Sequence, residues 1–230
     1  MSTPTVKLLS SMASREWLVA LAAQYARATG GSIANEFAGG VEVAKRVRAG
    51  AAIDLVVLAR KPIDELTAEG LLQEGGRVDL VRSGIGIAVR AGAPRPAVGD
   101  EAGVRRAVLD AASIGYSTGP SGTYLEKLFE RWGVLETVRP RITVAQPGVP
   151  VGSLVAEGRC ALGFQQLSEL IHLPGIEVLG PLPDPIQLLT VFAGAVTRGS
   201  TQADAARAVL AYLASPAAAD TKRRCGCEPA

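Results

Sequence analysis

Three short turns of small residues, each set between an apolar run and an amphipathic stretch, constrain this chain more than any other feature. They are Ser10-Ser11-Met12, Gly39-Gly40 and the segment from Ser117 to Gly122. An apolar run, a helical pattern and a second apolar run predict a β-α-β unit with a parallel sheet and right-handed crossovers. Strand-to-helix turns of this kind direct free backbone N–H groups beyond the sheet edge, where an anion can bind. The sequence therefore predicts an α/β fold with anion-binding turns.

Apolar runs and helical spacings alternate along the first part of the chain. The runs at residues 6–9, 33–37 and 53–59 predict buried strands, and the last is apolar enough for a parallel sheet covered on both faces. Two stretches between them have helical spacing. One carries Leu18, Leu21, Ala22 and Tyr25 and ends at Gly30, and the other carries Val41, Ala44, Val47 and Arg48 and ends at Gly50.

Two extended segments, at residues 84–90 and 186–193, bracket a central region with its own alternation. Central strands are predicted at residues 113–116, 142–145 and 161–164, central helices at residues 101–111, 124–132 and 152–157, and closing helices at residues 203–213 and 216–224. Two crossing segments predict two lobes joined by a two-segment hinge. One lobe is expected to comprise residues 1–83 with 188–230, and the other residues 84–187.

The composition excludes several classes of protein. Lys and Arg number 24 against 22 Asp and Glu, the charges are spread without blocks, and aromatic residues make up only 4%. Nucleic-acid binding needs a concentrated basic surface with aromatic platforms, so no nucleic-acid partner is predicted. No stretch approaches the roughly 20 apolar residues of a membrane span, so no direct membrane insertion is expected. The first residues lack a basic and an apolar region, which predicts a cytoplasmic protein as written, or a periplasmic one if a leader has been removed.

Cysteine and histidine offer little for metal or redox chemistry. The three cysteines, Cys160, Cys225 and Cys227, fit a reducing compartment, because an odd number cannot form a complete set of disulfides. Cys225 and Cys227 lack the C-x-x-C spacing, and His172 has no partner nearby in the sequence. The two late cysteines are expected to be residues of a tail, and neither a metal site nor a cofactor is predicted.

Four groups of residues carry a family resemblance that covers nearly the whole chain. They are Phe37-x-Gly39-Gly40 continuing through Ala44, Val47, Gly50-Ala51 and Asp54 to Val57; Gly86-Ile87-Ala88-Val89-Arg90-x-Gly92-Ala93-Pro94; Ser121-Gly122-x-Tyr124-x-x-x-Leu128-Phe129-x-x-Trp132-Gly133; and Leu213-Ala214-Ser215-Pro216 with Gly226-Cys227-Glu228-Pro229. In this order they resemble the molybdate-binding-protein-like branch of the type II periplasmic solute-binding proteins. The resemblance implies two lobes, each a mostly parallel sheet flanked by helices, that close on a ligand like a hinged clamp.

The same resemblance assigns ligand contacts to the turns. The implied contacts are Ser10, Ser11, Met12, Gly39 and Gly40 in the first lobe, and Ser121, Gly122, Thr123, the helix start at residues 149–152, Gln165 and Gln166 in the second lobe. Arg15, one turn into the first helix, is a further candidate, as a clamp for a carboxylate. Each also has a purely structural interpretation: serine as a helix cap, glycine for tight packing, glutamine in a solvated loop and arginine at the surface. Molybdate-type members tend to have serine where Gly39 stands and tyrosine near Gln165 or Gln166. An organic acid with carboxylate and hydroxyl groups therefore stands beside molybdate as a candidate ligand.

Two functions compete at this level. The first is a solute-binding protein that captures a small anionic ligand and delivers it to the membrane component of an ABC transporter. The alternative is an isomerase that moves a double bond in an unsaturated polycarboxylic acid, as in aconitate. That reaction needs a base, for which Glu16, Glu36, Glu42 and His172 are the candidates. A third possibility is a sensor module, although the sequence contains no DNA-binding appendage. Binding is favoured over catalysis, because no nucleophile–histidine–acid set, phosphate-binding loop or zinc motif is present.

Overall fold

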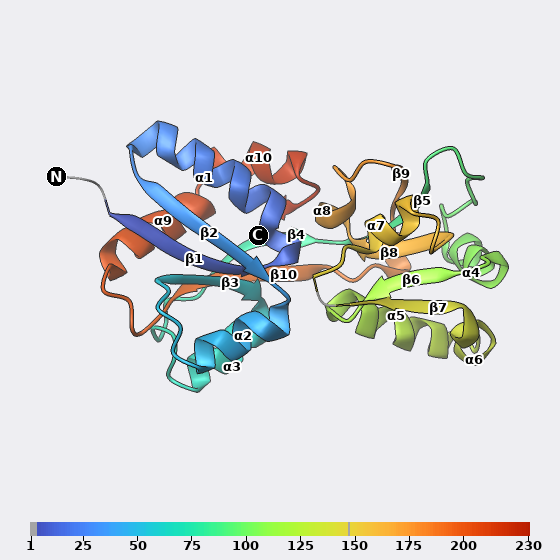
Figure 1. Ribbon diagram of the computed structural model, residues 1–230, viewed down its shortest axis with the longest axis horizontal. Helices are drawn as coiled ribbons and strands as arrows, with labels where there is room; N and C mark the ends of the chain where they lie inside the picture. The colour runs from blue at the N-terminus through green and yellow to red at the C-terminus, as the bar shows by residue number, and fades with distance from the viewer. Residues whose placement is uncertain (1–3, 147) are drawn as a thin grey trace. The chain divides into compact units, whose positions relative to one another are not determined.

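The computed structural model describes residues 4–146 and 148–230, which divide into two compact units. The first unit is the chain through Ser83 together with Val191–Ala230, and the second unit is Gly84–Thr190. From the sequence, the boundary at which the chain returns to the first unit is expected between residues 187 and 188. In the structure the second unit extends to Thr190, where β10 begins. The α/β class of the fold is confirmed (Figure 1).

The first unit contains a six-stranded sheet covered by helices on both faces (Figure 1). Its elements are β1 (Thr5–Ser11), η1 (Met12–Ser14), α1 (Arg15–Thr29), β2 (Ser32–Ala38), α2 (Gly40–Arg48), β3 (Leu55–Ala59), α3 (Arg60–Ala68), β4 (Val78–Ser83), β10 (Thr190–Val196), α9 (Ala203–Ala214), η4 (Pro216–Ala218), α10 (Ala219–Arg224) and β11 (Glu228–Pro229). The strand order is β11-β4-β10-β3-β1-β2. β1 is parallel to β2 and β3, whereas β10 is antiparallel to β3.

The second unit repeats this arrangement around a five-stranded sheet. Its elements are β5 (Ile85–Arg90), α4 (Glu101–Asp110), β6 (Ile114–Ser117), α5 (Pro120–Arg131), α6 (Leu135–Val138), η2 (Arg139–Arg141), β7 (Ile142–Ala145), α7 (Val151–Ala156), β8 (Leu162–Gln166), α8 (Leu167–Leu170), β9 (Ile176–Pro181) and η3 (Asp184–Ile186). The strand order is β7-β6-β8-β5-β9, with β6 parallel to β7 and β8 and β5 antiparallel to β8 and β9. Each sheet is therefore mixed. The predicted parallel arrangement holds for three neighbouring strands in each sheet, namely β2-β1-β3 and β7-β6-β8.

Alternating side chains along the strands build a core on each face of the first sheet. Leu8 and Val57 pack with α1 and α9, whereas Leu9 and Val56 pack with α2 and α3. This two-sided burial explains the apolar run predicted at residues 53–59, because a strand covered on both faces has no solvent-facing side. Gly30, at φ 74°, ends α1 in the left-handed conformation, as predicted.

Several predicted details differ from the structure. Val41 is 84% exposed, and Val43 takes its place in the core, because α2 begins at Gly40 and turns residue 43 toward the sheet. The extended segment predicted from residue 186 is shorter: a 3-10 turn ends at Ile186, and β10 begins at Thr190. Cys225 and Cys227 are buried in the core of the first unit and are not tail residues, since β11 pairs with β4 and ties the end of the chain to the sheet.

Candidate functional site

The carboxyl ends of β1, β2 and β3 meet at one edge of the first sheet, called here the first edge. Ser11, the last residue of β1, is in register with Ala38, the last residue of β2. A Cβ placed on Gly40 would lie 3.9 Å from the Cβ of Ser11. The structure thus brings the first and second predicted turns together, as expected for neighbouring parallel strands.

The two serines of the first edge have different environments. Ser10 is fully buried, and its hydroxyl donates a hydrogen bond to the carbonyl oxygen of Val57 on β3 (2.9 Å). Ser11 is 8% exposed, and its hydroxyl has no hydrogen-bond partner in the described parts of the chain. The Ser10 hydroxyl therefore helps to hold the sheet together, whereas the Ser11 hydroxyl remains available to a ligand.

The amino end of α2 adds backbone donors to the first edge. Gly39 precedes the helix in an extended conformation and provides no side-chain cap. The carbonyl of Gly39 accepts from the N–H of Val43 (2.9 Å), which is the first regular helical bond. The preceding N–H groups of the first turn have no acceptor within the helix, and the helix dipole favours negative charge there.

The other residues predicted for this region are less clearly placed for binding. Met12 lies in the half-buried turn η1, directly after β1. Arg15 is exposed and forms a salt bridge with Glu16 (3.1 Å), which matches the surface interpretation of this arginine. Glu36 is exposed and receives two hydrogen bonds from Arg46. This ion pair lowers the pKa of the Glu36 carboxyl and makes Glu36 a weak candidate for a base.

A second edge lies at the carboxyl ends of β6, β7 and β8 in the second unit. Gly122, in the first turn of α5, lies so close to the end of β6 that a Cβ there would be 1.7 Å from the carbonyl oxygen of Ser117. Ser121 is 1% exposed and Thr123 is exposed. Gly119 caps the helix without a side-chain hydrogen bond, so the first N–H groups of α5 also lack intrahelical acceptors.

The two glutamines of the second edge are the last residues of β8, not loop residues, because they pair with Ile85 and Gly86 of β5. The side-chain amide oxygen of Gln165 (Oε1) accepts from the backbone N–H of Val151 (2.8 Å), where α7 begins. The side chain of Gln166 is 3% exposed and donates to the hydroxyl of Thr190 (3.0 Å). The amide oxygen of Gln166 has no partner among the described residues. Both ends of the Gln165 amide are therefore hydrogen-bonded within the protein, whereas the amide oxygen of Gln166 can still accept a hydrogen bond.

One functional candidate at the second edge was not singled out from the sequence. Glu169 lies on α8, and its Oε1 accepts a hydrogen bond from the side-chain amide of Gln165 (2.8 Å). Burial raises the pKa of the Glu169 carboxyl to about 7, and the hydrogen bond from Gln165 opposes that rise. The i, i+4 spacing to Gln165 is the only signal in the sequence, and it does not reveal burial.

Two observations concern metal ligands and a buried charge away from the two edges. In the described ranges, no three His, Cys, Asp or Glu side chains come together to hold a metal ion. Lys222 is 2% exposed, and its amine donates to the carbonyl oxygen of Leu80 (2.8 Å). Burial lowers the pKa of this amine to about 8, although Cys227 acts in the opposite direction. Lys222 therefore anchors α10 to β4.

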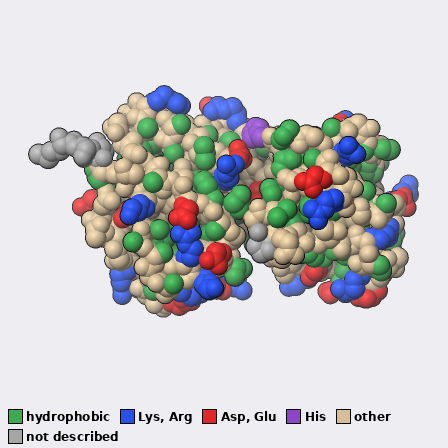
Figure 2. Space-filling model, viewed as in Figure 1, with side chains coloured by type: hydrophobic (Ala, Val, Ile, Leu, Met, Phe, Trp, Pro, Cys, Tyr) green, Lys and Arg blue, Asp and Glu red, His purple; other side chains and the backbone are tan. Residues whose placement is uncertain are grey.

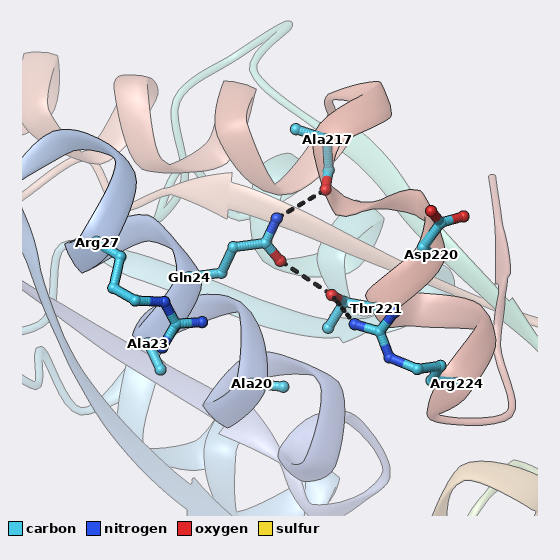
Figure 3. Close-up of a pocket in the computed structure, with 8 residues that line it drawn as sticks. All are labelled: Ala20, Ala23, Gln24, Arg27, Ala217, Asp220, Thr221 and Arg224. Carbon is cyan, nitrogen blue, oxygen red and sulfur yellow. Dashed lines mark hydrogen bonds between the residues drawn. The ribbon is translucent and has the colours of Figure 1, made fainter.

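A pocket of about 450 Å³ lies between α1 and α10 (Figure 3). Its walls are Ala20, Ala23, Gln24, Arg27, Ala217, Asp220, Thr221 and Arg224. Gln24 donates to the carbonyl oxygen of Ala217 and accepts from the hydroxyl of Thr221, which also accepts from Arg224. These hydrogen bonds join the two helices, so the pocket has a structural explanation that does not require a ligand.

Surface charge and hydropathy agree with the composition. Figure 2 shows basic and acidic side chains interspersed on the visible face, without a continuous basic area. In the part of the chain that the structure describes, no helix combines the length and apolar character that a membrane crossing requires.

Comparison with known proteins assigns the family. The chain matches the bacterial extracellular solute-binding protein family over residues 6–228. It is 40% identical over 177 residues to an aconitate isomerase from Pseudomonas sp, covering 76% of this chain and 67% of the relative. It is 24% identical over 224 residues to the molybdate-binding protein ModA of Escherichia coli (strain K12), covering 90% of this chain and 82% of the relative.

Solved structures support the same fold. The periplasmic molybdate-binding protein of Azotobacter vinelandii superposes with a TM-score of 0.79 at 21% identity, covering 96% of this chain and 98% of that chain. The resemblance predicted from the sequence is confirmed by this match and by the family match. The chain belongs to the bacterial extracellular solute-binding protein family.

Proposed function

We propose that this protein binds a small anion rich in oxygen atoms, either an organic polycarboxylate or an inorganic oxyanion. One observation carries the proposal: the Ser11 hydroxyl is buried without a partner beside the uncapped amino end of α2. A buried hydroxyl without a partner costs free energy, and an oxygen of a bound anion would accept its hydrogen bond. Hydroxyl and N–H donors can hold an anion without burial of a lysine.

Among such anions, organic carboxylates are favoured. The relative with 40% identity is named for aconitate, a tricarboxylate, whereas the relative named for molybdate is 24% identical. Gln166 adds an acceptor at the second edge, which suits a ligand that carries hydroxyl or carboxyl protons. That one anion contacts both edges at once remains a prediction from the sequence.

The ligand class can be tested with a panel of molybdate, sulfate, phosphate, citrate, trans-aconitate and propane-1,2,3-tricarboxylate. A ligand that binds only the folded protein raises the free energy of unfolding, by about 2.7 kcal/mol at a concentration 100 times Kd, and therefore raises the unfolding temperature. We expect stabilisation by tricarboxylates, with Kd measured by calorimetry. A panel in which every anion leaves the unfolding temperature unchanged would contradict the proposal.

The contribution of the first edge can be separated by two serine variants. Ser11→Ala removes the free hydroxyl and should weaken binding about 10-fold, equivalent to about 1.4 kcal/mol. Ser32→Ala is the matched control, since Ser32 is an exposed residue at the opposite end of β2. Equal affinities of the parent and Ser11→Ala would remove Ser11 from the site.

A second candidate function is isomerisation of an unsaturated polycarboxylate. The specific observation that favours it is the 40% identity to a protein named aconitate isomerase. In such a reaction a base removes a proton from the methylene carbon, the double bond moves by one position, and a proton returns to the former alkene carbon. No oxidant, reductant or metal is consumed, and one residue can both remove and return the proton.

Proton NMR distinguishes binding from isomerisation. The protein is incubated with trans-aconitate in D₂O, and the vinyl and methylene signals of the ligand are followed. Conversion to the cis isomer with deuterium uptake would establish the enzyme. Saturable binding with unchanged ligand signals over many hours would establish a binder.

The family description also suggests where the protein acts. We propose that the chain acts outside the cytoplasm and delivers its ligand to the membrane component of an ABC transporter. Fractionation of the producing bacterium tests the location. Ligand uptake in a strain that lacks the protein tests the transporter, and normal uptake in that strain would contradict the delivery role.

A further inference from the structure

The second edge contains a hydrogen-bonded chain with a defined direction. A backbone N–H can only donate, so the N–H of Val151 requires that the Gln165 amide present its oxygen to α7. The nitrogen of that amide must then face Glu169, and Glu169 Oε1 must accept. When the Glu169 carboxyl is protonated, its proton is therefore on Oε2.

Glu169 Oε2 has no hydrogen-bond partner among residues 4–146 and 148–230, and the side chain is only part-buried. We propose that Glu169 is the proton-exchanging group of the second edge: Oε2 donates its proton to, or takes one from, a bound organic acid, and Gln165 is the positioning residue. This inference rests on the proposed function and names its ligand class as a carboxylic acid. In the isomerase alternative, the same carboxyl would exchange the methylene proton.

Among the elements that pack on α8, the Gln165 amide is the polar side chain that affects the pKa of Glu169. α8 packs on β5, β8, β9 and the start of α7. The charged groups of these elements are Arg90 and Glu177, which lie near the far end of β5, while Ile85 at the near end pairs with Gln166. His172 follows α8 and is exposed. Burial raises the pKa of Glu169 to about 7, near the pH at which a group can both donate and accept a proton.

The main test compares the parent protein with Glu169→Gln by calorimetry with propane-1,2,3-tricarboxylate between pH 5.5 and 8.5. This probe has no double bond to move, and its own titration affects both proteins equally. We expect the ratio of parent to variant affinity to fall at least fivefold as the pH rises through 7, because deprotonation replaces a donor with a negative charge. Glu157→Gln, an exposed residue at the end of α7, is the matched control and should follow the parent.

A second measurement does not depend on the ligand. Carbon-13 NMR of the glutamate carboxyl carbons, assigned with Glu169→Gln, should show one residue that titrates near pH 7. Gln165→Leu should move that titration to higher pH, because the carboxylate loses its donor, whereas a merely structural role for Gln165 would leave it unchanged. Titration of Glu169 in the ordinary range near pH 4.5 would overturn the inference.

The outcomes separate this inference from the proposed function. If molybdate binds and the tricarboxylate does not, the carboxylic-acid inference fails and anion capture stands. If the ratio of parent to Glu169→Gln affinity for the tricarboxylate does not change with pH, the inference also fails and anion capture also stands. If no anion binds at any pH, both fail.

Discussion

The two edges share one strand order and differ in chemistry. The first edge is formed by β2-β1-β3 and the second by β7-β6-β8, and in both a central strand is parallel to its two neighbours. The first edge offers backbone N–H groups and the Ser11 hydroxyl, which do not titrate near neutral pH. The second edge adds two amide side chains and the carboxyl of Glu169. The same backbone design therefore presents one edge whose polar groups do not titrate near neutral pH and another that includes a carboxyl whose pKa is about 7.

The largest expected effect comes from the turns themselves. A Cβ on Gly122 would overlap the Ser117 carbonyl, whereas a Cβ on Gly40 would meet its nearest neighbours at 3.9 Å. Gly122→Ala should therefore lower the free energy of unfolding by at least about 3 kcal/mol, and Gly40→Ala should change it by no more than about 1 kcal/mol. Urea denaturation measures both. Gly119→Ala is the control within the same turn, since its nearest contact would be 3.6 Å, and equal stabilities of Gly119→Ala and Gly122→Ala would contradict the close approach.

The next effect is a pH dependence confined to the second edge. Below pH 4.5 Glu169 is protonated in both the folded and the unfolded protein, and between pH 4.5 and about 7 only the folded protein keeps the proton. The free energy of unfolding should fall with rising pH across this window, by about 3 kcal/mol, and remain low above pH 7. Parallel denaturation curves of the parent and Glu169→Gln measure the difference. Curves whose separation is the same at pH 4.5 and pH 7.5 would show that the carboxyl is not desolvated.

A smaller effect should appear for Ser10 at the first edge. Ser10→Ala removes the hydrogen bond to the Val57 carbonyl and should lower the free energy of unfolding by about 1 kcal/mol. Thermal unfolding at pH 7 measures the change. A variant as stable as the parent would show that the hydroxyl does not support the sheet.

The smallest effect on stability is expected one residue later. Ser11→Ala removes a hydroxyl without a partner, so the ligand-free protein should keep its free energy of unfolding within about 0.5 kcal/mol or gain slightly. The same denaturation assay measures it, with Ser10→Ala as the comparison. A loss as large as that of Ser10→Ala would mean that Ser11 has a structural partner.

Much of the fold follows from local pattern. The strand-turn-helix order at residues 6–59 determines three parallel strands, and β1, β2 and β3 lie where the apolar runs predict. Three strands that depend on distant pairing were not predicted, namely β4, β9 and β11. β11 pairs with β4, and β9 pairs with β5. The burial of Cys225 and Cys227 follows from such a long-range pairing, which composition does not reveal.

The sequence predicts that the candidate residues lie at strand ends, but it does not predict their hydrogen bonds. The alternation of side chains along a strand places Ser10 and Ser11 on opposite faces of β1. Only the structure shows that the Ser10 hydroxyl donates to the Val57 carbonyl and that the Ser11 hydroxyl has no partner among the described residues. Glu169 required knowledge that α7 and β8 approach each other through Gln165. Such contacts depend on tertiary packing, which a single sequence does not specify.

The discontinuous first unit has a consequence for biosynthesis. Its sheet includes β10 and β11 and is covered by α9 and α10, so its last parts emerge from the ribosome after the whole of Gly84–Thr190. The second unit can acquire its structure during translation, while β4 and the free side of β3 wait for β10 and β11. During that interval their apolar faces are exposed to chaperones, and the thiols of Cys225 and Cys227 are the last to be shielded from oxidation.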